Sequence, residues 1–179
     1  MQTRQEGADG LLSPCGRVLV DFAARAEVEA WSAIDDVVMG GRSSSALRAT
    51  GTGSAFFAGT VALEHGGGFA SIRSPDAPRA LDGRRGLRLH CRGDGQRYKL
   101  RVRTSTAFDG IVYQAPFLAP TGLWSTAELP FESFVPVFRG RSVPGMPPLG
   151  ADAIVSFGLL ISDGQAGSFR LELAWITAF

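Results

Sequence analysis

Residues 86–103 read GLRLHCRGDGQRYKLRVR, two runs in which apolar and polar residues alternate on either side of Asp94-Gly95. A period of two is typical of β-strands, because successive side chains of a strand point to opposite faces. Asp-Gly between two such runs favours a tight β-turn, since both central positions of that turn need positive φ. The stretch therefore predicts two antiparallel strands joined as a hairpin.

In the register set by this turn, Arg92 would pair with Arg97, His90 with Lys99, and Arg88 with Arg101. One face would then be basic, with Arg88, His90, Arg92, Arg97, Lys99, Arg101 and Arg103. The other would be apolar and face the core, with Leu87, Leu89, Cys91, Tyr98, Leu100 and Val102. Like charges directly opposite one another are destabilising. We therefore expect compensation by acids such as Asp35, Asp36, Glu64 or Glu128, with an anionic partner as the alternative.

The rest of the chain follows the same pattern, with 23 glycines and 10 prolines dividing it into short runs. No apolar stripe at helical spacing persists for three turns. The predicted strands are 17–22, 42–49, 54–64, 69–73, 86–92, 97–104, 110–117, 124–129, 154–162 and 168–179. Helical turns are expected at 23–30 and 130–134, and a surface loop at 140–150. About ten strands predict an all-β sandwich or barrel, a single domain over 17–179 after an N-terminal extension at 1–16.

Composition narrows the class of protein. Charged residues make up 20% of the chain and apolar residues 45%, which excludes general disorder. A net charge of +1 gives no global attraction to nucleic acid, and no stretch is long enough to insert into a membrane. Cys15 and Cys91 do not form a disulfide framework, and the first ten residues lack a secretory pattern. We therefore expect a reduced, cytoplasmic setting, with Cys91 as a small buried hydrophobe.

Four segments contain motifs that a β-sandwich fold alone does not require. They are WSAIDDVVMGGRS at 31–43, GGGFASIR at 66–73, RGDGQRY at 92–98 and FRGR at 138–141. Together they resemble the complex I intermediate-associated protein 30 family. The similarity runs in order from about Trp31 to the C-terminus, and it also includes Phe57-Ala58-Gly59, Gln114, Trp124, Pro130-Phe131 and the 163–169 segment.

That resemblance implies a galactose-binding-like jelly roll. It also implies a non-enzymatic role in assembling respiratory complex I, a role best described for eukaryotic members. The sequence departs from the family pattern at Asp35 and at His65, where asparagine is expected.

The residues of these motifs can also be interpreted from their chemistry alone, without the family resemblance. Asp35 and Asp36 could bind Ca²⁺, but two carboxylates supply too few ligands. We expect them to cap backbone N–H groups or to pair with Arg73 or Arg139. The three glycines at 66–68 indicate a turn, because no Lys-Ser/Thr follows as in a phosphate-binding loop. Arg139 and Arg141 could anchor an acidic partner or fix a loop to a carboxylate.

Enzyme signatures are weak. His65 adjoins a glycine turn and His90 lies on the basic face, and neither has a recognisable nucleophile nearby. The cysteines and histidines have no zinc-ligand spacing, and no cofactor is indicated. Asp35, Asp36, Glu64 or Asp163 could converge as a glycosidase pair, but sequence does not show their separation.

Three hypotheses result. The first is a protein-binding module that contacts respiratory-complex subunits or assembly intermediates, through the 31–43 loop and the basic hairpin face. The second is a sugar- or anion-binding module that uses Arg73, Arg92, Lys99 and Arg139, and the third is a hydrolase. Exposure of Trp31, Trp124 and Trp175 would help to separate the first two, although each is expected in the core. The candidate binding residues are Trp31, Asp35, Asp36, Met39, Arg73, Arg88, His90, Arg92, Arg97, Lys99, Arg101, Arg139 and Arg141.

Overall fold

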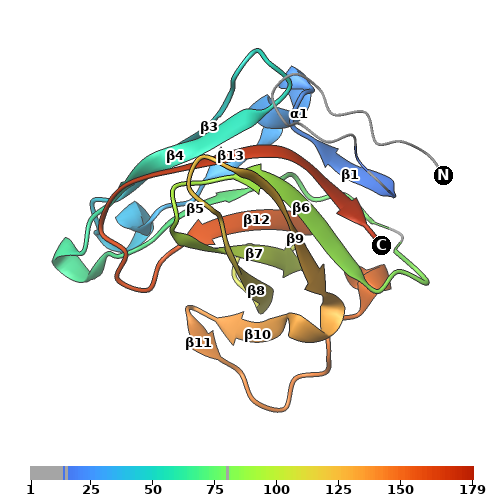
Figure 1. Cartoon of the computed structure of the whole chain (residues 1–179). Coiled ribbons are helices and arrows are strands. Elements are labelled where there is room, and N and C mark those ends of the chain that lie inside the picture. Colours follow the sequence, from blue (N-terminus) through green and yellow to red (C-terminus); the bar gives the residue numbers. More distant parts are fainter. Residues whose placement is uncertain (1–13, 15, 80) are drawn as a thin grey trace.

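The computed structural model describes residues 14, 16–79 and 81–179, and these form two antiparallel sheets packed face to face (Figure 1). In the first sheet the strand order is β3-β4-β13-β6-β9, and β1 also pairs with β13. Its strands are β1 (Arg17–Asp21), β3 (Ser44–Ala49), β4 (Ala55–Val61), β6 (Gly86–Arg92), β9 (Trp124–Pro130) and β13 (Gly167–Ala178).

The second sheet has the order β11-β10-β8-β7-β12-β5-β2. Its strands are β2 (Ser32–Ala33), β5 (Ala70–Arg73), β7 (Arg97–Arg103), β8 (Val112–Leu118), β10 (Val135–Phe138), β11 (Arg141–Ser142) and β12 (Ser156–Ile161). Among the described residues, five short helices connect the strands: α1 (Arg25–Ala30), η1 (Asp36–Met39), η2 (Glu64–Gly66), η3 (Phe131–Ser133) and η4 (Ala151–Ala153). The predicted all-β jelly-roll sandwich of galactose-binding type is confirmed.

The predicted hairpin is wrong, although both of its strands exist. β6 pairs with β13 and β9 in the first sheet, whereas β7 pairs with β12 and β8 in the second. The Asp94-Gly95 turn therefore carries the chain from one sheet to the other. The register Arg92–Arg97, His90–Lys99 and Arg88–Arg101 does not occur, and there is no continuous basic hairpin face.

Asp94 holds this turn at the point where the chain crosses between the sheets. Its carboxylate accepts hydrogen bonds from the Gln96 N–H at 3.1 Å, the Tyr98 hydroxyl at 3.0 Å and the Arg170 N–H at 2.7 Å. The Arg170 bond ties the turn to β13, and the Tyr98 bond ties it to the core side of β7. The Arg170 partner lies 76 residues away in the sequence, so the local Asp-Gly signal does not encode it.

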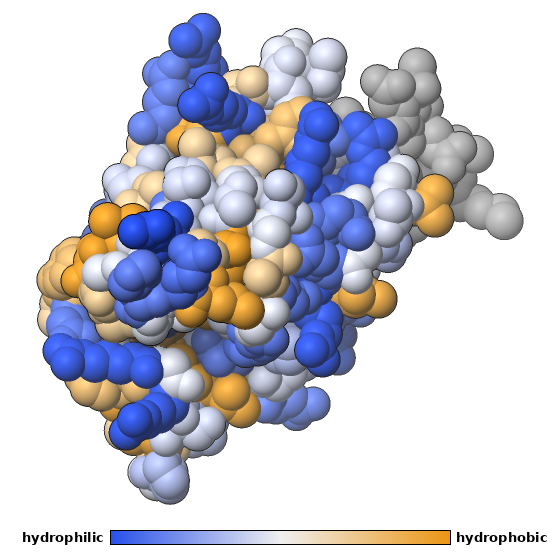
Figure 2. All heavy atoms as spheres, turned by 90° about the vertical axis from the view of Figure 1, so that its left-hand side faces the viewer, coloured by the Kyte–Doolittle hydropathy of each residue, from blue (hydrophilic) through white to orange (hydrophobic). Residues whose placement is uncertain are grey.

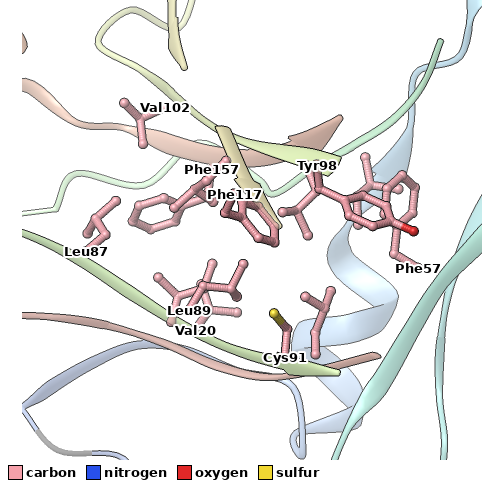
Figure 3. Close-up of a cluster of buried hydrophobic side chains, with 14 of the residues drawn as sticks. Val20, Phe57, Leu87, Leu89, Cys91, Tyr98, Val102, Phe117 and Phe157 are labelled. Atoms are coloured by element: carbon pink, nitrogen blue, oxygen red, sulfur yellow. The ribbon is translucent and has the colours of Figure 1, made fainter. Parts of the chain in front are cut away.

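The apolar sides of β6 and β7 face each other across the core, as their alternation predicts. Leu87, Leu89 and Cys91 from the first sheet lie opposite Tyr98 and Val102 from the second (Figure 3). All five side chains are buried. Burial raises the pKa of the Cys91 thiol to about 12, so Cys91 packs as a small hydrophobe, as predicted.

Most strand bounds agree with the predictions within a few residues. The helical turns at 23–30 and 130–134 correspond to α1 and η3. Strands β2 and β10 were not predicted, and β11 lies inside the segment predicted as a loop at 140–150. The N-terminal extension falls almost entirely outside the described residues, so the division into 1–16 and 17–179 stays a prediction. None of the helices within the described ranges is both long and apolar enough to cross a bilayer.

Candidate functional site

The residues of the predicted basic face are divided between the two outer surfaces of the sandwich. On the first sheet, Arg88 donates to Glu128 at 2.6 Å and Arg92 to Glu172 at 2.5 Å. On the second sheet, Lys99 donates to Asp163 at 2.7 Å. The expected internal compensation therefore exists for Arg88, Arg92 and Lys99. Of the acids suggested for it, Glu128 serves this role for the face, Glu64 lies 3.8 Å from Arg42, and Asp35 and Asp36 have other partners.

His90 is buried rather than exposed on a basic surface. Its ring stacks between Trp124 and Trp175, with centroid distances of 5.1 and 5.0 Å, and its Nδ1 lies 2.9 Å from the Thr126 hydroxyl. Trp31 is also buried, packed on Phe22 and bonded through Nε1 to Glu27. Trp31 and Trp175 are buried, as expected, Trp31 in the core cluster and Trp175 against His90. Trp124 is only half-buried, so the expected core position is wrong for this residue.

Asp35 and Asp36 cap backbone N–H groups, which confirms one of the two predicted roles. Asp35 accepts from the N–H of Ser45 at 2.8 Å, from its hydroxyl at 2.6 Å and from the N–H of Ser71 at 3.0 Å. All three partners are donors, so a carboxylate suits this position at least as well as the expected asparagine. Asp35 thereby joins β3 to β5, and neither aspartate pairs with Arg73 or Arg139.

The Asp36 carboxylate is fully buried and joins three separate segments. It accepts from the Ser43 N–H at 2.9 Å and hydroxyl at 2.5 Å, from the Gly68 N–H at 2.7 Å and from the Phe69 N–H at 3.3 Å. Gly41 and Gly67 form the walls of its site. A Cβ at Gly41 would lie 2.3 Å from the carboxylate, and a Cβ at Gly67 would lie 2.6 Å from it. The motifs at 31–43 and 66–73 therefore form one interlocked structure.

The ionisation of Asp36 reflects two opposing effects. Burial is the largest single effect and disfavours the charged form, but the hydrogen bonds from Ser43, Gly68 and Phe69 together outweigh it. They hold the pKa of Asp36 below its usual value of 3.8. Asp36 is therefore a stable anion at neutral pH, and its oxygens are already occupied by donors.

The η1 turn presents apolar side chains to solvent. Val37, Val38 and Met39 are 61%, 70% and 60% exposed, directly after the buried Asp36. We call these three residues the η1 tip. Leu63 beside η2 is half-exposed. Figure 2 views this end of the sandwich and shows hydrophobic patches interspersed with hydrophilic side chains.

A pocket of about 190 Å³ adjoins the η1 tip on the outer surface of the second sheet. Val38 and Ile34 line one side, and the 108–110 loop and Arg139 line another. We call this hollow the arginine pocket, because its lining contains Arg73, Arg101, Arg103 and Arg139. Phe69, Val112 and Phe157 add apolar surface.

The structure thus brings together four of the predicted site residues: Arg73, Arg101 and Arg139 in the pocket, and Met39 on the adjoining tip. It places Arg97 and Arg141 on exposed surface away from the pocket lining. Arg103, Phe108 and Asp109 line the pocket without having been selected as site residues. An aromatic residue in the turn-rich segment 104–110 was the signal available for Phe108.

Electrostatics distinguish the arginine pocket from the rest of the surface. Burial, then Arg103 and Arg73, lowers the pKa of Arg101 to about 10. Burial and Arg73 also lower the pKa of Arg103, with Asp76 and Asp109 opposing them. Within the described residues, no group of three or more His, Cys, Asp or Glu side chains is arranged to hold a metal ion.

The fold is a β-sandwich of the type found in carbohydrate-binding modules. A family 11 carbohydrate-binding module from a Clostridium thermocellum cellulosomal cellulase superposes with a TM-score of 0.65 at 18% identity, covering 91% of this chain and 96% of that one. The family profile of complex I intermediate-associated protein 30 matches residues 20–173, and the chain belongs to that family.

Two relatives extend the comparison. The mitochondrial complex I intermediate-associated protein 30 of Mus musculus is 28% identical over 91% of this chain. An uncharacterised protein of Schizosaccharomyces pombe is 30% identical over 82% of it. The chain spans 56% of the mouse protein and 76% of the yeast protein.

Proposed function

We propose that this protein is a non-enzymatic binding module that assists the assembly of a respiratory complex by contacting a protein subunit or intermediate. The observation that carries this proposal is the η1 tip, in which three consecutive apolar residues are exposed on a firmly held turn. Membership of the complex I intermediate-associated protein 30 family supports the assembly role. A cytoplasmic location, expected from the sequence, belongs to the same proposal.

The contrast between the base and the tip of this turn supports a binding role. Asp35 and Asp36 together accept seven hydrogen bonds, so the backbone on both sides of η1 is fixed. A fixed loop loses little conformational entropy when a partner binds. Contiguous exposed apolar side chains on such a loop are typical of a protein-interaction site. Neighbouring arginines supply a polar rim of the kind that surrounds such sites.

Co-purification from the native host tests this proposal. Val38→Asp and Met39→Asp variants should lose the partner recovered with the unmodified chain after gentle cross-linking. Leu123→Asp is the matched control, because Leu123 is 68% exposed and lies elsewhere, before β9. Equal recovery of a partner by the unmodified chain and by both tip variants would contradict the proposal.

Small-ligand binding is the second candidate function, and the arginine pocket is the observation that favours it. Of the two ligand classes expected from the sequence, a neutral sugar suits this pocket less well. Sugar sites generally offer a flat aromatic platform with few polar groups, whereas this lining carries four guanidinium groups and includes none of the three tryptophans. Arg92 and Lys99, predicted to share the ligand site, have Glu172 and Asp163 as partners outside the pocket.

A further inference from the structure

Three neighbouring strands build the floor of the arginine pocket. In the second sheet Gly158 of β12 lies between Arg73 of β5 and Arg101 of β7, paired with both in register. These three residues therefore share one face of the sheet. Because Gly158 has no side chain, the space between the two arginines stays open. A Cβ at Gly158 would also lie 2.9 Å from the Ile72 carbonyl oxygen, so a larger residue does not fit without a shift.

Arg101 lacks a compensating group. Its Nε is buried without a hydrogen-bond partner, and no hydrogen bond or ion pair joins its guanidinium to the part of the chain that the structure describes. Arg73 likewise has no ion pair there, and its guanidinium lies 5.4 Å from the centroid of the Phe108 ring. Both side chains are half-buried. Charges that are withdrawn from water are normally paired in proteins, because desolvation without pairing is costly.

The acids near this pocket do not neutralise its positive charge. Asp109 is the one carboxylate in the lining against four guanidinium groups, and it accepts a hydrogen bond from Arg139 at 2.5 Å. The whole chain has a net charge of only +1, so this is a local concentration of positive charge. Burial and repulsion from Arg103 and Arg73 lower the pKa of Arg101, as expected where positive charge is concentrated.

Arg103 differs from its neighbours because it holds the pocket wall. Its guanidinium donates to the carbonyl oxygens of Ala107 and Phe108, and these bonds fix the 104–110 loop. The loop in turn places the Phe108 ring over Arg73. We therefore regard Arg103 as a positioning residue, and Arg101 and Arg73 as the donors available to a ligand.

The geometry points to a binding site for a small organic oxyanion, a phosphate or carboxylate carried on an apolar or planar body. Guanidinium groups bind both oxyanions through paired N–H donors. The apolar wall formed by Phe69, Phe108 and Val38 would contact the body of the ligand. This proposal rests on the second candidate function, small-ligand binding at the arginine pocket, and names the ligand class; it does not depend on the proposed protein partner, so it is tested on the purified chain.

Calorimetric titration of the purified chain at low salt tests the proposal. The probes are phenyl phosphate, benzoate and inorganic phosphate, with benzyl alcohol as the neutral analogue. We expect phenyl phosphate or benzoate to bind, and benzyl alcohol not to bind measurably. Arg101→Met should weaken binding about tenfold or more, as expected for loss of a hydrogen bond to a charged group. Arg97→Met is the matched control, because Arg97 lies on the same face of β7 but is exposed outside the pocket.

Thermal unfolding of the same variants separates loss of the site from loss of the fold. Without ligand, Arg101→Met should unfold at the same temperature as the unmodified chain or higher, because a half-buried charge without an ion-pair partner is removed. Tighter binding of phenyl phosphate than of benzoate would assign the site to phosphates, and the reverse to carboxylates. Equal binding of the anionic probes by the unmodified chain and by Arg101→Met, or no binding at millimolar concentration, would overturn the proposal.

Discussion

Replacing Asp36 with alanine should destabilise the fold more than replacing any exposed acid. The Asp36 carboxylate accepts four hydrogen bonds, from the backbone N–H groups of Ser43, Gly68 and Phe69 and from the Ser43 hydroxyl. Alanine would leave the three backbone donors without an acceptor in a site that is shielded from water, whereas the Ser43 hydroxyl would keep the Ala62 carbonyl oxygen at 3.4 Å. The variant tests whether the interlocked motifs are a structural unit.

The loss of free energy of unfolding in Asp36→Ala follows from these contacts. Each buried donor that loses its partner costs about 1–3 kcal/mol. The Phe69 bond, at 3.3 Å, belongs at the weak end, and water entering the vacated space would recover part of the loss. We expect Asp36→Ala to lower the free energy of unfolding by about 3–5 kcal/mol, a large part of the 5–15 kcal/mol typical of a domain.

Asparagine provides an intermediate case. Its carbonyl oxygen can replace Oδ2, which accepts from the Ser43 hydroxyl, Gly68 and Phe69, but its NH₂ group would then face the Ser43 N–H. Asp36→Asn should therefore cost about 2 kcal/mol. Urea unfolding at pH 7, followed by tryptophan fluorescence, measures both values. Asp82→Ala is the control, because Asp82 is exposed and should change stability by less than about 0.5 kcal/mol. A cost below 1 kcal/mol for Asp36→Ala would refute the reasoning.

The other predictions concern acid stability and two buried groups. Because the folded-state pKa of Asp36 is depressed, its contribution is complete above pH 3.8 and is lost as the pH falls through the lower folded value. Urea unfolding at a series of acidic pH values should therefore show a smaller loss of stability for Asp36→Asn than for the unmodified chain, and equal losses would contradict this. Tyr98→Phe removes the hydroxyl that donates to Asp94 and should cost about 1–2 kcal/mol in the same urea assay; no cost would show that this bond does not stabilise the turn. In a Cys15→Ser background, native Cys91 should not react with a thiol reagent at pH 8, because burial raises its pKa to about 12; rapid labelling without denaturant would show that the core opens easily.

The sequence predicted strands well because their alternation is a local signal. Both arms of the 86–103 stretch are strands, and their apolar sides face the core. Sheet pairing was mispredicted at the same place, because a tight turn and a crossover between sheets can share the Asp-Gly signal. What separates them is the hydrogen bond from the Arg170 N–H to Asp94, across 76 residues of sequence. No local pattern contains such a contact.

The candidate site was only partly predictable for a similar reason. The 31–43 loop was selected from its motif, and the capping role of its two acids was among the predicted ones. Arg73 and Arg101 were selected too, but not as neighbours, because their proximity depends on β12 lying between β5 and β7. The unusual backbone at His65, with φ of 56°, also accounts for the asparagine expected there, since Asn and His are both enriched in this conformation.

Binding of a protein partner by the η1 tip, as proposed above, is tested most directly by photo-cross-linking at one position. A photoreactive amino acid placed at residue 38 of the full chain, expressed in the native host, should cross-link to a defined protein on irradiation. The same amino acid at residue 123, also exposed but before β9, should not capture that protein. Identification of a respiratory-complex subunit or assembly intermediate at position 38 is the result that we predict. Absence of any cross-link at position 38, or identical products at both positions, would contradict the claim.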